Sequence, residues 1–534
     1  MRVVARLWCL VAALRRHSSS GVVVSRGLKQ QCRWGRPAAC LMAAAVSMKA
    51  VLLLAFLCAQ LCGGPQGTVD ATVGTTFIGH HLLSVRIESQ AHLKTLLDVK
   101  DNLDLDFWSH AIREGHTGLV RVPPESINEI VDVMESAGIK YHVNSDNLQS
   151  LVNEEKRLIA PDDASATMGE TASDLLDYAH YYSYNSVTKA LLGFAKVHSF
   201  LSTQVIGQTH DDNDIIAVKV ASENDLPIIL IDCGVHAREW ITISACMYII
   251  NEASALLSCG RVCLLFVRNG AASPPQPKSA PMSRLKVDAL CISMRRECEL
   301  VSRHQERSTD VSEIFNYEWR VIPCLNPDGY EFSRKSNRMW RKNRSVQYSS
   351  NGTKCYGTDL NRNFDVSFCS TPEEADPCKE TFCGKAPFSE PESHAFREYV
   401  TEFRNRIAFY FSFHAFGDLW LIPYSFRSER PPDYDELMER ANRAVSAIQE
   451  VSGTRYKTGS IASLLYIAPG TAVDWMYVKK GVRMSFTIEI SSEKNGFFLN
   501  QSNVIDVPKQ AAEAISDAAC RLKRAPLWPV QENR

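Results

Sequence analysis

The amino-acid sequence predicts an α/β domain that follows a smaller α+β unit. From residue 178 onwards, apolar runs with strand character alternate with segments whose apolar residues recur at helical spacing, a pattern typical of α/β domains. Between residues 80 and 155, shorter strand and helix patterns alternate, and the polar stretch 153–177 separates the two units. With 534 residues, of which 45% are hydrophobic, the chain can form a substantial core.

The N-terminal segment has the features of a secretory leader. Residues 48–64, MKAVLLLAFLCAQLCGG, combine a lysine, an apolar run too short to span a membrane and small residues at the end, which is the pattern of a signal peptide. Residues 1–47 contain eight Lys or Arg and no acidic residue. An Arg-rich transit peptide is one interpretation of them, but we favour a translated upstream region and take Met48 as the start. We therefore expect a secreted, extracellular protein.

Charge and cysteine content indicate which partners and which cellular compartment to expect. A formal net charge of -1 argues against nucleic acid as an electrostatic partner, and we expect no membrane partner. Seventeen cysteines favour an oxidising compartment, which agrees with secretion.

The smaller unit alternates strands and helices. In chain order it contains a strand at 81–87, a helical segment, a short strand at 118–122, a helix within 126–138 that ends at its glycine, a strand at 139–143 and a last helix. Considered alone, such a unit is a ferredoxin-like binding module.

The polar linker offers one site to a trypsin-like protease. Lys156-Arg157 is its only basic pair, and the next Lys or Arg is Lys189. If such a protease activates the protein, we expect cleavage at Arg157. The alternative is that the pair ends a helix with charge of the sign that the helix dipole prefers.

The larger domain begins near residue 178. A helical pattern at 186–198, a strand at 214–221, a strand before His236 and a helix from Glu239 to about Leu257 follow one another. Because α/β domains place ligand sites at the carboxyl ends of their strands, His236 is in a suitable position.

Residues 260–309 interrupt this pattern. They contain PPQPKSAP, nine Lys or Arg against four acidic residues, and three cysteines. We favour a retained intron or a faulty gene model, with a lineage-specific insertion as the alternative, and we expect disorder or poor packing in this segment.

The strongest chemical signal is the segment 227–242, PIILIDCGVHAREWIT. Its apolar run predicts a buried strand that breaks at Gly234, just before His236, Arg238 and Glu239. An imidazole and a carboxylate three residues apart at a strand-to-helix corner can face one point and bind zinc, leaving room for a third ligand and a water. Alone, such a pair is more often a surface histidine and a solvated glutamate.

Further motifs follow this segment in order. They are Asn326-Pro327-Asp328-Gly329-Tyr330, Trp340-Arg341-Lys342-Asn343-Arg344, Asp359-Leu360-Asn361-Arg362-Asn363, Ser412-Phe413-His414, Tyr466 and Glu489. The whole set resembles the pancreatic-type zinc metallocarboxypeptidases, the carboxypeptidase A/B subfamily, over roughly residues 75–525. The resemblance implies a zinc carboxypeptidase fold at 178–525, with a mixed central β-sheet flanked by helices. It also identifies residues 75–157 as the family's pro-domain, which caps the active-site cleft.

The resemblance implies one zinc ion, with His236, Glu239 and His414 as its ligands. Considered alone, His414 would be a core histidine of the apolar strand IAFYFSFHAF. Asp359 resembles the carboxylate that orients a zinc histidine. Arg341 resembles the arginine that polarises the scissile carbonyl and stabilises the oxyanion.

Glu489 lies in the apolar strand MSFTIEI, where burial disfavours the carboxylate and raises its pKa. A base of this kind can take a proton from an attacking water and pass it to the leaving amine, which is the role that the resemblance implies. The alternative is a structural ion pair.

A carboxypeptidase must also bind a free carboxylate, which a guanidinium, an amide and a phenol can do together. The resemblance gives these roles to Arg362, Asn361 and Tyr466, so peptide or protein C-termini are the expected substrates. Arg238 resembles a residue that contacts the substrate further from the scissile bond; otherwise it is a surface arginine.

Val473 occupies the position that, in the family, lies at the bottom of the specificity pocket. The other matching pocket positions are also uncharged: Ile461, Leu421, Ala468 and Thr487. A buried Lys or Arg would find no counter-ion there. We therefore expect an A-type preference for aliphatic or aromatic C-terminal residues, with a B-type preference for Lys or Arg as the alternative.

The resemblance also implies three disulfides, Cys233 with Cys246, Cys355 with Cys378, and Cys369 with Cys383. We expect Cys324 to be a buried free thiol, and Lys342 and Arg344 to be solvated. The alternative from another class of function is a catalytically inactive relative that binds peptides. Such a relative would be expected to lack Glu489 or a zinc ligand, and all of these residues are present. We expect a monomer.

Overall fold

The computed structural model describes residues 74–108, 114–161, 178–221, 223, 225–268, 316–349, 351–403, 405–494 and 496–520. The predicted extension at 1–47, the signal peptide at 48–64 and residues 269–309 of the predicted insertion lie outside this part of the chain. Among the described residues, no helix is long and apolar enough to cross a membrane.

The N-terminal unit, residues 74–161, is a four-stranded antiparallel sheet with helices against it. The strand order is β2-β3-β1-β4. Its elements are β1 (His81–Ile87), α3 (Gln90–Val99), β2 (Asp106–Phe107), β3 (His116–Val122), α4 (Ile127–Ser136), β4 (Lys140–Ser145), α5 (Leu148–Glu155) and the 3-10 helix η1 (Lys156–Leu158). The predicted strands and helices are present, and Gly138 follows the end of α4 with a positive φ of 67°, which favours glycine.

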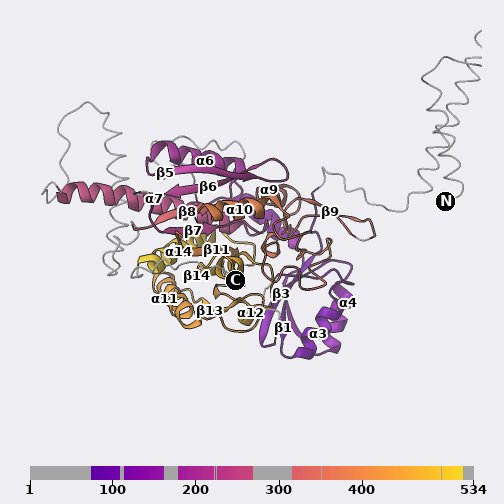
Figure 1. The fold of residues 1–534 in the computed structure, drawn as a ribbon. Coiled ribbons are helices and arrows are strands. Elements are labelled where there is room, and N and C mark those ends of the chain that lie inside the picture. The colour runs from indigo at the N-terminus through magenta and orange to yellow at the C-terminus, as the bar shows by residue number, and fades with distance from the viewer. Residues whose placement is uncertain are drawn as a thin grey trace, which may run out of the picture. The chain divides into compact units, whose positions relative to one another are not determined.

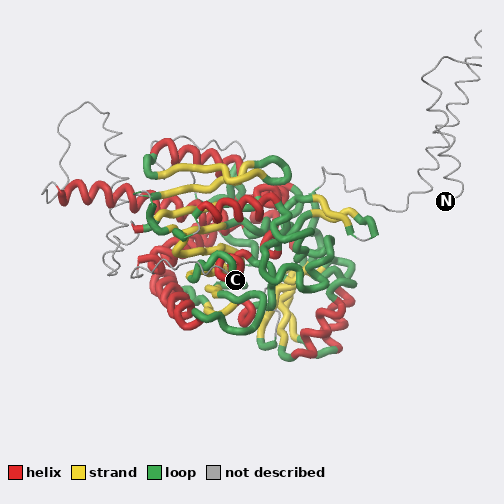
Figure 2. The backbone as a smooth tube through the Cα atoms, in the orientation of Figure 1, coloured by secondary structure: helices red, strands yellow, loops and turns green. Residues whose placement is uncertain are grey.

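The large domain, residues 178–520, is built on an eight-stranded mixed sheet in the order β13-β12-β14-β11-β7-β8-β6-β5 (Figures 1 and 2). The central strands β8, β7, β11 and β14 run parallel to one another, and antiparallel strands follow on both sides. The strands are β5 (Leu201–Gln208), β6 (Asp214–Val220), β7 (Ile228–Asp232), β8 (Glu318–Ile322), β11 (Ile407–Ala415), β12 (Leu419–Ile422), β13 (Lys457–Ser460) and β14 (Met484–Ile490).

Both faces of this sheet are buried. In β7, Ile229 and Ile231 belong to one apolar cluster, whereas Ile228 and Leu230 belong to another. Because neighbouring residues of a strand point to opposite faces, a central strand covered on both sides is a continuous apolar run. The covering helices are α6 (Tyr184–Val197), α7 (Trp240–Arg268), α11 (Tyr434–Ser452) and α14 (Gln501–Cys520) for the first cluster, and α10 (Pro391–Glu402) and α13 (Ala472–Val478) for the second.

Shorter elements complete the domain: α9 (Pro327–Lys335), the hairpin of β9 (Val346–Tyr348) and β10 (Lys354–Tyr356), the 3-10 helix η4 (Leu360–Arg362) and α12 (Ile461–Leu464). The predicted end of α7 near Leu257 is wrong, because the helix continues to Arg268. The residues RVCLLFVR after Gly260 include good helix formers and no proline, so nothing local ends the helix.

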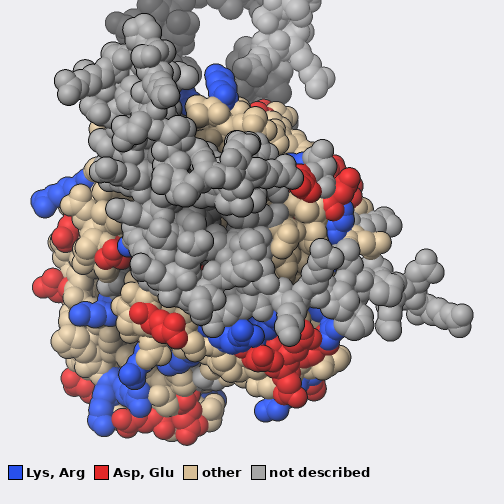
Figure 3. Space-filling model, turned by 90° about the vertical axis from the view of Figure 1, so that its left-hand side faces the viewer, with Lys and Arg blue, Asp and Glu red and all other residues tan. Residues whose placement is uncertain are grey.

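The structure contains the three predicted disulfides, with S–S distances of 2.00, 1.85 and 2.11 Å. Cys324 is a buried free thiol, as predicted. On the face drawn in Figure 3, the described Lys and Arg side chains lie among Asp and Glu, which agrees with the near-neutral net charge.

Candidate metal centre and active site

Three buried side chains converge where β7 and β11 end. The ligand-type atoms of His236, Glu239 and His414 all lie within 4.8 Å of one another. His236 Nδ1 is 2.8 Å from Glu239 Oε1 and 3.1 Å from His414 Nδ1, and His414 Nδ1 is 3.2 Å from Glu239 Oε2. Among the described residues this is the one group of three or more His, Cys, Asp or Glu side chains that could hold a metal ion.

Local hydrogen bonds fix the loop that carries two of these residues. Thr242 Oγ1 donates to the carbonyl of Glu239 at 2.7 Å and accepts from the amide of Gly234 at 3.1 Å. Gly234 has a φ of +62°, and a Cβ there would lie about 3 Å from Ile243 and Cys324. The glycine therefore allows the sharp turn from β7 into the loop before α7.

The donor set fits a zinc ion. Asp359 Oδ1 lies 3.0 Å from His236 Nε2, so that Nε2 carries the proton and the Nδ1 lone pair faces the centre. Two imidazole nitrogens 3.1 Å apart and a carboxylate form a cluster of electron-pair donors, which is stable when a proton or a cation lies among them. Two nitrogens and one carboxylate are ligands that zinc accepts, with an open position left over.

Glu489 lies beside this cluster because of strand register. In the parallel pair of β11 and β14, Glu489 is opposite His414. The side chain is buried, and burial raises the pKa of Glu489 to about 8, against the opposing effects of His414 and Arg341. A carboxyl group with this pKa can exchange a proton near neutral pH.

Arg341 contributes the fixed positive charge of the site. Its Nε and Nη2 donate to Asp359 Oδ2 at 3.0 and 2.9 Å, and its Nη1 lies 4.0 Å from Glu239 Oε1. Burial works against the guanidinium, but Asp359 and its other neighbours outweigh this and raise the pKa of Arg341. Asp359 therefore joins the candidate metal ligand His236 to Arg341.

A second group of donors lies next to the cluster. Arg362 Nη2 donates to the hydroxyl of Tyr466 at 2.8 Å, and Arg362 Nη1 donates to the carbonyl of Asn361 at 2.7 Å. Asn361 Nδ2 lies 3.4 Å from His414 Nε2, which places this group at the metal centre. The guanidinium, amide and phenol of this group can bind a carboxylate together.

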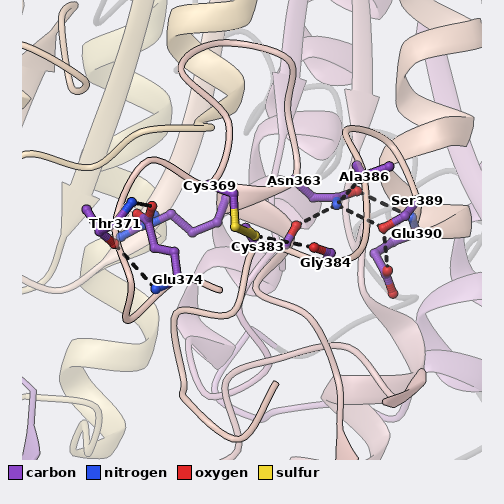
Figure 4. Close-up of a disulfide and its surroundings, with 10 residues drawn as sticks. Asn363, Cys369, Thr371, Glu374, Cys383, Gly384, Ala386, Ser389 and Glu390 are labelled. Carbon is purple, nitrogen blue, oxygen red and sulfur yellow. Dashed lines mark hydrogen bonds and ion pairs between the residues drawn. A yellow bond between two sulfur atoms is a disulfide. The ribbon is translucent and has the colours of Figure 1, made fainter. Parts of the chain in front are cut away.

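The loop closed by the Cys369–Cys383 disulfide contacts the segment that carries Asn361 and Arg362; Figure 4 shows the disulfide with Asn363 and Glu374. Asn363, the residue after Arg362, donates from Nδ2 to the carbonyls of Cys383 and Ala386 at 2.7 and 3.0 Å. Arg362 Nε is also 3.5 Å from Glu374 Oε1, within the same loop. The disulfide thus fixes the segment that supplies Asn361 and Arg362.

Comparison with known proteins identifies the family. A family model described as "Zinc carboxypeptidase" matches residues 188–256 and 294–514, and one described as "Carboxypeptidase activation peptide" matches residues 83–155. The chain belongs to the zinc carboxypeptidase family. The gap in the first match overlaps the predicted insertion at 260–309, whose bounds stay a prediction.

Individual relatives agree with this assignment. Carboxypeptidase A1 of Rattus norvegicus is 30% identical over 468 residues, 87% of this chain and 96% of the relative. Carboxypeptidase A2 of Mus musculus is 27% identical over 439 residues, 82% of this chain and 92% of the relative. The crystal structure of the carboxypeptidase A from Helicoverpa armigera covers 84% of this chain and 99% of its own, with a TM-score of 0.65 and 26% identity. The chain is a zinc metallocarboxypeptidase with an activation peptide, a pancreatic-type zymogen of the A/B subfamily.

In this zinc carboxypeptidase, Val473 is buried in α13, and the residue before it contacts Asn361. The amide of the preceding Ala472 donates to Asn361 Oδ1 at 3.0 Å. Val473, Leu421 and Ile461 belong to one apolar cluster, and Ala468 and Thr487 are buried.

The carboxylate of the next residue, Asp474, accepts hydrogen bonds from Ser425 and Phe426. Its Oδ2 accepts from the amides of Ser425 and Phe426 at 2.9 and 3.1 Å, and from the Ser425 hydroxyl. Burial raises the pKa of Asp474 to about 6.

The activation unit lies against the active-site side of the zymogen. Arg238 Nη1 lies 3.2 Å from Asp106 Oδ2 of β2, and Trp108 packs on Phe497 with ring centroids 5.3 Å apart. A cavity of about 800 Å³ is lined from both sides, with Asp106 and Lys100 on one side and Arg238, Arg341 and Tyr466 on the other.

Two further ion pairs connect the unit to the Cys369–Cys383 loop, namely Lys100 to Glu373 at 2.8 Å and Lys379 to Asp101 at 2.6 Å. A fourth, between Glu155 and Arg338, is fully buried; Arg338 Nη2 donates to Glu155 Oε1 at 2.9 Å and Arg338 Nε to Oε2. Sequence reasoning missed Arg338, whose signal was only its place three residues before Arg341.

The prediction that Lys342 is solvated is wrong, and Arg344 is half-buried. Lys342 is buried, and its Nζ donates to the carbonyls of Pro377 and Lys379 at 3.0 and 2.9 Å. The Arg344 guanidinium lies over the rings of Phe332 and Trp340, at 3.6 and 4.6 Å from their centroids. Both cations therefore stabilise the segment around Arg341.

Proposed function

We propose that this chain is a secreted zymogen of a zinc carboxypeptidase that removes aliphatic or aromatic residues from peptide C-termini. The observation that carries the preference is the buried, uncharged environment of Val473 next to Asn361. A C-terminal Lys or Arg would have to bury its charge there without a counter-ion.

The substrate's terminal carboxylate binds to Arg362, Asn361 and Tyr466. The guanidinium supplies two parallel donors, the amide of Asn361 a third, and the phenol a fourth. This group lies 3.4 Å from a candidate metal ligand, so a bound C-terminus places its last peptide bond at the metal centre.

His236, Glu239 and His414 would hold the zinc ion, which would polarise the scissile carbonyl and lower the pKa of a water. Glu489 takes the proton from the attacking water and delivers it to the leaving amine. Arg341, held by Asp359, stabilises the negative charge that develops on the carbonyl oxygen.

Activation requires removal of the N-terminal unit. Asp106 forms an ion pair with Arg238. The N-terminal unit also contributes to the walls of the cavity that Arg341 and Tyr466 line. Arg157 is exposed in η1, which supports cleavage there by a trypsin-like protease. Secretion through the signal peptide at 48–64 and a monomeric state complete the proposal.

The test uses protein expressed from Met48, with and without residues 260–309, and treated with trypsin. Matched peptides ending in Phe, Leu, Arg or Glu are then assayed with and without a zinc chelator. We expect chelator-sensitive release of Phe and Leu, and an N-terminal sequence of the mature enzyme that begins at Leu158. Release of Arg alone would support B-type specificity instead. No release from folded, zinc-loaded and processed protein would support a peptide-binding relative.

A further inference from the structure

A buried hydrogen-bonded chain leads from His414 to the neighbouring strand. His414 Nε2 lies 3.1 Å from Ser412 Oγ, and Ser412 Oγ donates to Asp232 Oδ1 at 3.0 Å. Ser412 and His414 are two residues apart on β11 and so point to the same face, and Ser412 is opposite Asp232 in the parallel pair of β11 and β7. Asp232, Ser412 and His414 are each only 1 to 2% exposed.

The direction of this chain follows from the hydrogen atoms available. An ionised carboxylate only accepts, so the single hydroxyl hydrogen of Ser412 is directed at Asp232. The Ser412 oxygen then accepts from Nε2–H of His414. This leaves the Nδ1 lone pair of His414 facing His236 Nδ1 and Glu239 Oε2, at 3.1 and 3.2 Å.

The other polar group near His414 Nε2 cannot replace Ser412. Asn361 Oδ1 accepts from the amide of Ala472 at 3.0 Å, which orients Nδ2 toward His414 at 3.4 Å. An amide NH₂ is a donor and cannot accept a proton from Nε2. Ser412 is therefore the acceptor that defines the histidine tautomer.

We propose that Ser412 and Asp232 are positioning residues that hold His414 in the tautomer required to bind the metal. His236 receives the same support directly from Asp359, whereas His414 receives it through a hydroxyl. The inference rests on the ligand set of the proposed function. Partners of this kind typically change metal affinity by about 10- to 100-fold.

The experiment compares zinc affinity, measured by chelator competition on the trypsin-activated enzyme, among S412A, S412T, S485A and the wild type. Ser485 is a matched control, because it is buried in the adjacent strand β14 and its hydroxyl donates to the carbonyl of Val482 at 2.7 Å, away from the ligands. We expect S412A to weaken zinc binding about 10- to 100-fold, S412T to restore it to within about threefold, and S485A to leave it unchanged. Equal affinities of S412A and wild type, or an equal loss in S485A, would overturn the proposal.

Nitrogen-15 NMR of the histidines in metal-free wild-type protein gives a readout that needs no variant to fold. We expect His414 to be protonated at Nε2, and protonation at Nδ1 alone would contradict the proposal. H414A separates this inference from the proposed function. If H414A binds zinc as well as wild type, the ligand assignment itself fails, whereas an effect of H414A without one of S412A rejects only the positioning role.

Discussion

At the scale of single residues, Glu489 is distinguished by its burial in β14 and by its register opposite His414. In the proposed function, Glu489 transfers a proton and does not bind the metal. We expect E489Q to lower kcat about 100- to 10,000-fold while zinc affinity changes little. Steady-state kinetics and metal analysis check this, with E493Q in the following loop as control. An active E489Q enzyme would exclude the general base role.

Val473 makes a different prediction. Replacing it by Asp places a carboxylate at the base of the proposed pocket, where it can pair with a substrate guanidinium. V473D should raise the ratio of kcat/KM for peptides ending in Arg over those ending in Phe by at least about tenfold. V473L keeps the site apolar and should preserve the Phe preference. An unchanged ratio in V473D would place the specificity pocket elsewhere.

At the scale of elements, Asp106 of strand β2 forms an ion pair with Arg238, and we expect this ion pair to depend on pH. Burial opposes ionisation of Asp106, but Arg238 and Arg121 outweigh it and hold the pKa of the carboxyl below its ordinary value. Its stabilising effect is thus complete above the ordinary carboxyl range and is lost as the pH falls below about 4.

We therefore expect the cleaved activation unit to dissociate more readily from the enzyme below about pH 4. D106N should weaken the complex about 10- to 100-fold at neutral pH and reduce the acid effect. Fluorescence anisotropy of the labelled unit measures the dissociation constant directly. A pH dependence identical in wild type and D106N would assign it to another group.

The segment that contains Arg157 makes a second prediction at this scale. The Glu155–Arg338 pair lies on one side of Arg157, and on the other the amide of Ala160 donates to the carbonyl of Tyr181 at 2.9 Å. Because a protease must open η1 to cut it, E155Q should accelerate cleavage by trypsin at least about tenfold. Glu154 is exposed, so E154Q is the matched control. Equal cleavage rates would show that the pair does not limit opening.

Prediction from the residues alone succeeded where the information was local, whereas the disulfides and the approach of His414 to His236 were predicted through the family resemblance. The apolar run of β7, the break at Gly234 and the glycine after α4 each lie within a few residues of the structure that they determine. The prediction for Lys342 failed, because its burial depends on the carbonyls of Pro377 and Lys379, which lie more than 30 residues away in the sequence. The hydrogen bonds that connect His414 through Ser412 to Asp232 were also not predicted, because 180 residues separate Asp232 from Ser412.

At the scale of the whole molecule, a metal ion in the cluster would join β11 to the loop before α7. Ligand binding to the folded state stabilises it by mass action. We expect removal of zinc to lower the melting temperature by on the order of 10 °C. Differential scanning calorimetry measures the shift, which should persist in E489Q and disappear in H414A. An unchanged melting temperature on chelation would argue against a structurally integrated metal.

The pairing of His414 with Glu489 links catalysis to folding fidelity. Side chains alternate between the two faces of a strand, so a slip of β14 by one residue would move Glu489 to the opposite face of the sheet. Misregistered molecules could still be compact and bind metal through β11 and the loop before α7, yet they would lack the base. Specific activity per bound zinc therefore reports what fraction of a preparation has the correct strand alignment.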